Sequence, residues 1–192
     1  TLAYLGYLAG HETIADAVAD PDFAALCDRL WSKEILPTVP QPEGEDLQAY
    51  CRALMGRYRD RSLRHRTWQI AMDGSQKLPQ RILGTIRDTL AAGREAPGLC
   101  LVVAAWMRYV GGVDEAGRPI DVRDPLADRL RAASDGADDA AGKVAALLSI
   151  KEVFGTDLPA DPRFQAAVSA GYEALLTKGA AGAVRDYLAR PG

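Results

Sequence analysis

Apolar residues recur along this chain at the spacing of an α-helix, and no segment shows the alternation of a half-buried strand. The most regular segment runs from Leu47 to Tyr58, where apolar side chains stand three and four residues apart and so share one helix face. Residues Pro97 to Val110 are apolar almost throughout, which predicts a helix buried on all sides. The pattern predicts an all-α fold of about eight to ten helices around this central one.

Helix breakers and caps locate the ends of the N-terminal helices. Gly10 interrupts the first apolar stretch, so residues 2–8 and 14–18 are expected to form two short helices or a broken pair. Asp20 followed by Pro21 is a helix cap with Pro at the first helical position. These signals predict a third helix that starts at Pro21.

The Asp73-Gly74 pair separates two further predicted helices. The first, near residues 63–70, is expected to end with Gly74 in the left-handed conformation, and the second begins at Pro79. Three more helices are predicted over residues 140–154, 162–177 and 180–189, while the turn-rich segment 111–124 forms at most a small hairpin.

Composition excludes several classes of protein. With 192 residues, 48% of them hydrophobic, the chain has enough apolar surface for one domain or one and a half. Its longest apolar run, Leu99 to Met107, is far shorter than the roughly 20 residues of a membrane span. Cys27, Cys51 and Cys100 have no metal-ligand spacing. We interpret all three as buried free thiols of a protein in the reducing cytoplasm, without a metal.

Positive charge is concentrated in one part of the sequence. The whole chain carries a formal charge of −3, but residues 52–94 contain ten Arg and Lys against three Asp, a local +7. The densest stretch is RHRTWQIAMDGSQKLPQR, from Arg64 to Arg81. A focused basic region on an acidic protein indicates a small anionic ligand more than a nucleic acid, which usually needs an extended basic face. The alternative is a solvated basic helix face without a ligand.

The candidate ligands for an anion in this stretch are Lys77, Arg66, Arg64 and Arg81. Arg offers a planar fork that holds a carboxylate or phosphate through two hydrogen bonds, and Lys adds a compact charge. Lys77 and Arg81 are four residues apart and would flank the first turn of a helix that begins at Pro79, where backbone N–H groups also favour an anion.

Other polar residues have two interpretations each. We expect Asp73 to cap the turn or pair with an Arg rather than to transfer protons. His65 is either a hydrogen-bonded structural residue or a group that titrates near neutral pH. Trp68 is expected in the core. Arg108 is expected to pair with a buried acid such as Asp114, with a substrate contact as the alternative.

Three strings resemble the C-terminal domain of the mannitol dehydrogenase family of long-chain polyol and uronate oxidoreductases. They are LAYLGYLAG at Leu2, the basic stretch at Arg64, and WMRYVGGVDEAGRPIDVRDPL at Trp106. The resemblance covers residues 1–192 and implies a helical substrate-binding domain similar to that of 6-phosphogluconate dehydrogenase. It also implies an N-terminal Rossmann domain that binds NAD and is absent from this chain, in agreement with the lack of a G-x-G-x-x-G motif here.

The reaction that the resemblance implies is zinc-independent hydride transfer between NAD(H) and a sugar acid, interconverting D-fructuronate and D-mannonate. The family's catalytic lysine and its Asn-Gly-x-His motif stand just before the LAYLG string. No catalytic, cofactor-binding or metal-binding residue is therefore expected in this chain, whose start at Thr1 suggests a fragment. By itself the chain is expected neither to bind NAD tightly nor to turn over.

Within the resemblance, the basic stretch faces the substrate, with Lys77 first and Arg66 and Arg64 behind it. Family members that act on neutral polyols tend to have an Arg where this chain has Gln69, so polyol contacts do not transfer directly. A carboxylate substrate suits the local charge better. The alternatives are a tagaturonate, mannitol or arabinitol oxidoreductase, or a non-catalytic helical interaction or dimerisation module. No nucleic acid or membrane partner is expected.

Overall fold

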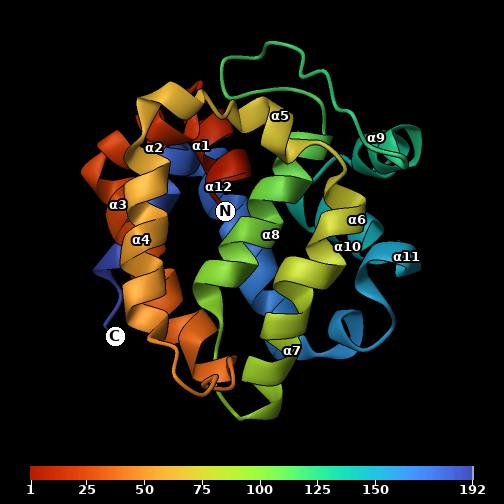
Figure 1. The fold of residues 1–192 in the computed structure, drawn as a ribbon. Helices are drawn as coiled ribbons and strands as arrows, with labels where there is room; N and C mark the ends of the chain where they lie inside the picture. The colour runs from red at the N-terminus through yellow and green to blue at the C-terminus, as the bar shows by residue number, and fades with distance from the viewer. Residues whose placement is uncertain (192) are drawn as a thin grey trace.

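The computed structural model describes residues 1–191, which fold into packed helices (Figure 1). Within that range there is no β-strand, and only two isolated bridges occur, Thr13 with Arg66 and Val113 with Pro119. The all-α prediction is confirmed.

The helix bounds are as follows. The α-helices are Leu2–Leu8 (α1), Ile14–Ala19 (α2), Pro21–Arg29 (α3), Leu47–Arg59 (α4), Thr67–Ala71 (α5), Gly74–Leu78 (α6), Gly84–Ala91 (α7), Pro97–Val110 (α8), Ala127–Asp135 (α9), Ala140–Leu148 (α10), Lys151–Phe154 (α11) and Pro162–Ala189 (α12). Short 3-10 or π-helical segments are Leu30–Ile35 (η1), Leu36–Thr38 (η2), Arg61–Leu63 (η3), Pro79–Leu83 (η4) and Leu158–Ala160 (η5).

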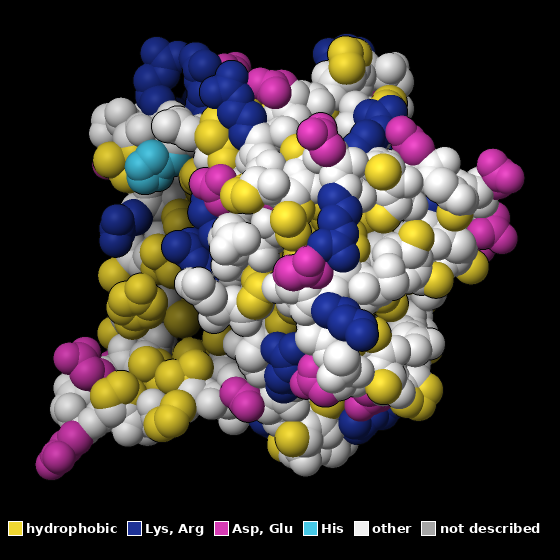
Figure 2. Space-filling view, turned by 90° about the vertical axis from the view of Figure 1, so that its right-hand side faces the viewer, with side chains coloured by type: hydrophobic (Ala, Val, Ile, Leu, Met, Phe, Trp, Pro, Cys, Tyr) yellow, Lys and Arg dark blue, Asp and Glu magenta, His cyan; other side chains and the backbone are white. Residues whose placement is uncertain are grey.

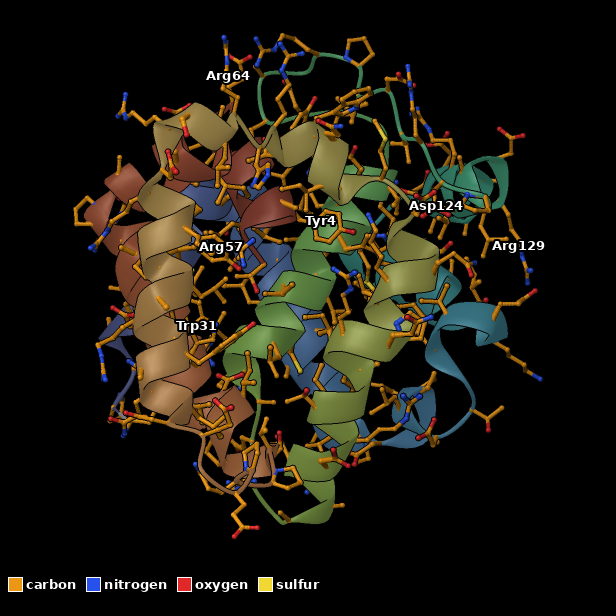
Figure 3. All side chains as sticks on the ribbon, in the orientation of Figure 1. Tyr4, Trp31, Arg57, Arg64, Asp124 and Arg129 are labelled. Atoms are coloured by element: carbon orange, nitrogen blue, oxygen red, sulfur yellow. The ribbon has the colours of Figure 1, made fainter. Side chains whose placement is uncertain are left out.

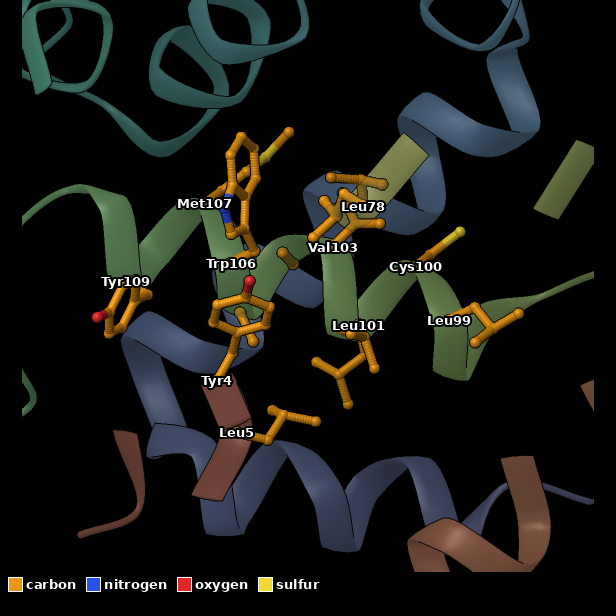
Figure 4. Packing of buried hydrophobic residues seen from close by; sticks show 14 of the residues in the cluster. Tyr4, Leu5, Leu78, Leu99, Cys100, Leu101, Val103, Trp106, Met107 and Tyr109 are labelled. Atoms are coloured by element: carbon orange, nitrogen blue, oxygen red, sulfur yellow. The ribbon is translucent and has the colours of Figure 1, made fainter. Parts of the chain in front are cut away.

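Helix α8 lies at the centre of the domain, as its apolar sequence predicts. Val103, Trp106 and Met107 have no exposed surface. Tyr4 and Leu5 of α1 pack beside it (Figure 4), and α12 runs behind it (Figure 1). Burying this much apolar surface is the main favourable contribution to folding, so α8 anchors the elements that border the site.

A buried carboxylate fixes the start of α8. The side chain of Glu34 on η1 is 4% exposed and accepts hydrogen bonds from the backbone N–H groups of Gly98 and Leu99, both at 2.8 Å. The hydroxyl of Tyr187 on α12 donates a third, also at 2.8 Å. Burial and the nearby Glu34 charge raise the pKa of Tyr187, so its hydroxyl stays protonated. These bonds join η1, α8 and α12 at one point.

Several predicted helix ends are confirmed. Gly10 ends the first helix with φ 87°, and the carboxylate of Asp20 caps α3 by accepting from the N–H of Asp22 at 2.9 Å. Gly179, at φ 69° and ψ 175°, breaks α12 into the two predicted helices. In each case the residue type matches the backbone conformation that the break requires.

The prediction of one helix over residues 140–154 is wrong. The chain leaves the helical conformation at Ile150, whose ψ is 90°, so α10 ends at Leu148 and α11 begins at Lys151. Ile150 and Phe154 are both buried. The bend turns both side chains into the core, and this burial outweighs the continuation of a regular helix.

Two other expectations about burial are corrected. Cys27 and Cys100 are buried, which raises the pKa of each thiol to about 12, but Cys51 is only partly buried. Helix α4, which carries Cys51, buries only Met55 completely. The helix packs against one side of the domain and leaves much of its apolar face at the surface. Trp68, also expected in the core, is only partly buried. None of the helices in residues 1–191 has the length and apolar character needed to cross a membrane.

Candidate functional site

A cavity of about 220 Å³ opens beside the first residue, and we call it the Thr1 cavity. The chain starts in the space between α4 and α8 (Figure 1), and Trp31 and Arg57 lie on the α4 side of that space (Figure 3). Aliphatic side chains of α1, α2 and η1 form much of the wall. The polar side chains of the lining belong to Thr1, Tyr58, His65 and Arg81, with the indole of Trp31 beside them.

The lining of the Thr1 cavity contains no Asp or Glu. Arg81 is exposed, and no ion pair in residues 1–191 involves it. Lys and Arg side chains and a His also gather along the left edge of Figure 2, around a surface of hydrophobic side chains. An acid-free cavity with a free guanidinium favours an anionic ligand, because the charge is not already neutralised by the protein.

Two aromatic residues form one side of the cavity. The ring centroids of Trp31 and Tyr58 are 6.2 Å apart, within the range of a favourable aromatic pair. Burial raises the pKa of Tyr58, so its hydroxyl is neutral and can donate a hydrogen bond. The sequence pattern placed Tyr58 on the apolar face of its helix but gave no sign that Trp31, on a different element, would lie opposite it.

Lys77 and Arg81 lie one helical turn apart along α6 and η4. The ammonium of Lys77 donates to the backbone carbonyls of Ile70 at 3.2 Å and Met72 at 2.7 Å, so it holds the end of α5. Lys77 does not line the Thr1 cavity itself, but Ile70, which it contacts, does. Of these two basic residues, only Arg81 is therefore part of the lining, while Lys77 lies outside it and reaches it through the backbone of Ile70.

Arg66 and Arg64 lie elsewhere. The Nε of Arg66 is 3.8 Å from a carboxylate oxygen of Glu12, and Arg66 lines a second cavity of about 270 Å³. Arg64 is exposed, in the left-handed conformation at φ 42° (Figure 3). Among the four predicted anion ligands, Arg81 alone therefore lines the Thr1 cavity.

His65 is held through its backbone and not through its side chain. Its backbone carbonyl accepts a hydrogen bond from the N–H of Ile14 at 2.9 Å, which attaches the basic stretch to α2. Its side chain lines the Thr1 cavity and makes no hydrogen bond within the described residues. The imidazole is therefore available to a ligand, which the sequence could not decide.

The turn at Asp73 differs from its prediction. Asp73, and not Gly74, adopts the left-handed conformation, at φ 57°. Gly74 begins α6, and a Cβ there would lie 2.3 Å from the indole nitrogen of Trp106 and 2.6 Å from the hydroxyl of Tyr4. Close packing against the core is thus the reason for glycine at this position.

Asp73 also makes no side-chain cap, although it stands at the N-cap position. The cap comes from Asp124, whose carboxylate accepts from the N–H of Ser75 at 2.7 Å. The N–H of Asp73 in turn donates to the carbonyl of Arg123 at 2.9 Å. The segment 111–124 therefore fixes the basic stretch from outside, a contact that sequence proximity could not reveal.

Trp68 is partly exposed rather than in the core. Its indole N–H donates to the carbonyl of Asp121 at 2.8 Å, and the guanidinium of Arg123 lies 4.8 Å above its ring. The ring therefore supports the segment 111–124 through a hydrogen bond and a cation–π contact. Within the described chain, no residue of that segment lines the Thr1 cavity, so the segment braces this site and does not cover it.

Arg108 has a structural role, but its predicted partner is wrong. The guanidinium donates to the backbone carbonyls of Val113 at 2.6 Å and Asp114 at 3.3 Å. The carboxylate of Asp114 instead accepts from Arg118 at 2.8 Å. Backbone N–H groups of Arg118 and Ala116 also bind it, and these bonds lower the pKa of Asp114. The turn that contains Asp114 thus supplies the donors to its carboxylate, and Arg108 of α8 does not.

The described residues do not form a binding site for a metal ion or for a dinucleotide. Residues 1–191 contain no cluster of His, Cys, Asp and Glu that could hold a metal ion. Nor do they contain a strand that leads through a turn into a helix, the arrangement that binds the phosphates of a dinucleotide. A dinucleotide therefore does not fit the residues of this chain as a self-contained site.

Fold and cavity together define an all-α domain with a basic, acid-free pocket at one edge. The chain belongs to the mannitol dehydrogenase family, whose C-terminal domain it matches over residues 1–176. This assignment rests on sequence and agrees with the helical architecture.

Two relatives with named activities are similar to this protein over nearly the whole chain. D-mannonate oxidoreductase of Escherichia coli (strain K12) is 50% identical over 93% of this chain and 37% of its own length. Mannitol 2-dehydrogenase of Phaeosphaeria nodorum is 33% identical over 97% of this chain and 32% of its own length. The chain thus spans about a third of the length of these curated relatives.

A solved structure has the same fold. The ternary complex of Pseudomonas fluorescens mannitol 2-dehydrogenase with NAD and D-mannitol superposes with a TM-score of 0.93 at 32% identity, over 99% of this chain and 38% of that one. The multi-helical C-terminal fold predicted for this chain is confirmed by that match.

Proposed function

We propose that this chain is the substrate-binding part of an NAD-dependent oxidoreductase that interconverts D-fructuronate and D-mannonate. The observation that carries the proposal is the Thr1 cavity, where, within the described part of the chain, Arg81 has no acidic partner and no carboxylate lines the wall. Such a lining suits a sugar acid better than a neutral sugar. The similarity to D-mannonate oxidoreductase supports the same substrate class.

The chain's own residues bind and orient the sugar in this proposal. Arg81 contacts the substrate from the cavity lining. Lys77, one turn earlier, lies outside that lining, and we propose that it adds a second basic contact at the edge of the cavity beside Ile70. Arg66 and Arg64, further out, raise the local potential that attracts an anion. Orienting the sugar against a separately bound reactant is itself a large contribution to catalysis.

NAD(H) exchanges the hydride in this reaction and is assigned to the part of the protein that this chain does not span. The N-terminal NAD-binding domain is the proposed partner, with the catalytic residues at the junction before Thr1. The solved relative contains both NAD and D-mannitol in a longer chain, which supports this division. A cytoplasmic location remains a proposal that rests on the free cysteines.

A polyol substrate is the second candidate, because the solved relative holds D-mannitol. The test is the full-length protein assayed with D-fructuronate and NADH, and separately with neutral ketoses. Preferential reduction of D-fructuronate supports the first candidate, and preferential reduction of ketoses supports the second. The isolated chain should show neither activity, and measurable turnover by it would contradict the division of roles.

Lys77→Ala tests the basic edge in the same assay. We expect roughly a 10- to 100-fold loss of kcat/KM, the size expected for a hydrogen bond to a charged group. Lys151→Ala is the matched control, because Lys151 is exposed on α11 and lies outside the cavity lining. Wild-type activity in Lys77→Ala, with Lys151→Ala also normal, would limit Lys77 to its contacts with the end of α5.

A further inference from the structure

Arg81 differs from the many arginines of this domain whose charge is used in an ion pair. Arg87 pairs with Asp157, Arg118 with Asp114 and Arg163 with Asp161. Arg81 lines the Thr1 cavity from η4, and no ion pair in the described chain includes it. Its guanidinium thus retains its capacity for a bidentate bond to a carboxylate.

His65 reaches the same cavity from a different element. It lies between η3 and α5, and its backbone is held by the hydrogen bond to Ile14. The backbone is held, and the side chain lines the cavity without a hydrogen-bond partner in residues 1–191, so the imidazole has a donor left for a ligand. Two donors from separate elements can hold one planar acceptor group in a single orientation.

The rest of the lining suits the body of a sugar rather than its charged end. Trp31 and Tyr58 offer ring surface and one hydroxyl donor, and the remaining wall is mainly aliphatic. Arg81 and His65 are the two residues of this lining, besides the hydroxyls of Thr1 and Tyr58 and the indole of Trp31, whose side chains can donate to an anion. A polyol of the same carbon chain carries a neutral hydroxymethyl group at that end and gains much less from the guanidinium.

We propose that Arg81 and His65 together bind the carboxylate of a sugar acid and thereby set the preference for acids over neutral sugars. This inference rests on the proposed function for the location of the substrate, and it adds the group that each residue binds. Arg81 supplies the charge and the bidentate geometry, and His65 fixes the orientation of the carboxylate.

The experiment compares two substrates that differ only at one end. D-fructuronate carries a carboxylate where D-fructose carries a hydroxymethyl group, and the products D-mannonate and D-mannitol differ in the same way. In the full-length protein, the acid preference is the ratio of kcat/KM values for D-fructuronate and D-fructose. Competition by D-mannonate and D-mannitol gives a second measure of the ratio that does not require turnover of the neutral sugar.

Arg81→Gln should reduce the acid preference roughly 10- to 100-fold, mainly through a higher KM for the acid. His65→Leu should reduce it roughly 2- to 10-fold, and His65→Gln, which keeps a donor, should reduce it less. Arg81→Lys keeps the charge but loses the fork, so an intermediate value is expected. Arg94→Gln is the matched control for loss of a positive charge outside the cavity.

The outcomes separate this inference from the proposed function. An unchanged preference in Arg81→Gln, in an enzyme that reduces D-fructuronate, overturns the carboxylate contact and leaves the function standing. An enzyme that reduces D-tagaturonate instead, with a preference that depends on Arg81, retains the contact and overturns the substrate. A wild-type protein that binds no sugar acid overturns both. Far-ultraviolet circular dichroism of each variant verifies that it is folded.

Discussion

At the start of α8 the carboxylate of Glu34 is buried and accepts three hydrogen bonds. In the Thr1 cavity, by contrast, the guanidinium of Arg81 is exposed and has no acidic partner among residues 1–191. Both groups carry a single charge, but their surroundings differ. The buried charge is tolerated because donors from α8 and α12 surround it. The exposed charge needs no internal partner, so it remains available to a ligand. One charge holds three helical elements together, and the other is the charge that we propose binds the substrate.

Replacing Glu34 should produce the largest loss of stability. Glu34→Ala leaves two backbone N–H groups and the Tyr187 hydroxyl buried without an acceptor. We expect a loss of about 3–5 kcal/mol in the free energy of unfolding, measured by urea denaturation. Glu43→Ala, at an exposed loop position, is the control and should change little. A loss below about 1 kcal/mol for Glu34→Ala would show that the start of α8 does not depend on this carboxylate.

Gly74→Ala tests the contact between the basic stretch and the core. The added Cβ meets Trp106 and Tyr4 at distances well below van der Waals contact. We expect about 1–3 kcal/mol of destabilisation from overpacking, seen as a lower Tm. Gly84→Ala is the control, because its Cβ would meet nothing within 4 Å and Ala has the higher helix propensity. Equal Tm values for the two variants would contradict the close packing at residue 74.

The ion pair of Asp157 and Arg87 should have a smaller, pH-dependent effect. The Arg87 hydrogen bond lowers the pKa of Asp157 to about 2 from 3.8. A carboxyl with a lowered folded-state pKa stabilises the protein above its unfolded pKa and loses that contribution as pH falls from about 4 to 2. Asp157→Asn should cost less than about 1 kcal/mol at pH 7, since the pair is largely exposed.

Urea unfolding at pH 7, 4 and 3 measures this difference between wild type and Asp157→Asn. The difference should shrink as the pH falls, and Asp138→Asn, at an exposed loop position, should show no such trend. A gap that widens toward low pH would contradict the ion pair's contribution.

The smallest effect on stability is expected in the cavity. Arg81→Gln should change the free energy of unfolding by no more than about 0.5 kcal/mol, because Arg81 is exposed and no ion pair in residues 1–191 includes it. The same variant should lose acid preference. A destabilisation comparable to that of Glu34→Ala would remove the contrast between the two charges and give Arg81 a structural role.

Patterns within single helices were predictable from the sequence. The apolar run 97–110 indicated the central helix, and Gly10, Asp20 and the break between 177 and 180 marked helix ends that the structure contains. These features depend on side-chain periodicity and on local backbone preferences, which neighbouring residues determine. The basic stretch 64–81 was also visible, because it is a local excess of charge.

What the sequence could not supply are contacts between distant segments. Asp124 caps α6 across 49 residues, Ile150 bends a helix to reach the core, and Trp68 supports a loop in place of joining the core. For the same reason the sequence could not show that the four basic candidates lie at different places in the fold. Arg81 lines the cavity, whereas Arg66 lies beside Glu12.

The sequence by itself thus determined the helical class, the family resemblance and the region of positive charge. Tertiary structure alone decided which charge remains free, because pairing depends on the carboxylates that folding brings within a few ångströms. It also decided that His65 and Arg81 line one cavity with Trp31 and Tyr58. No spacing along the chain encodes that arrangement, since the four residues come from four separate segments.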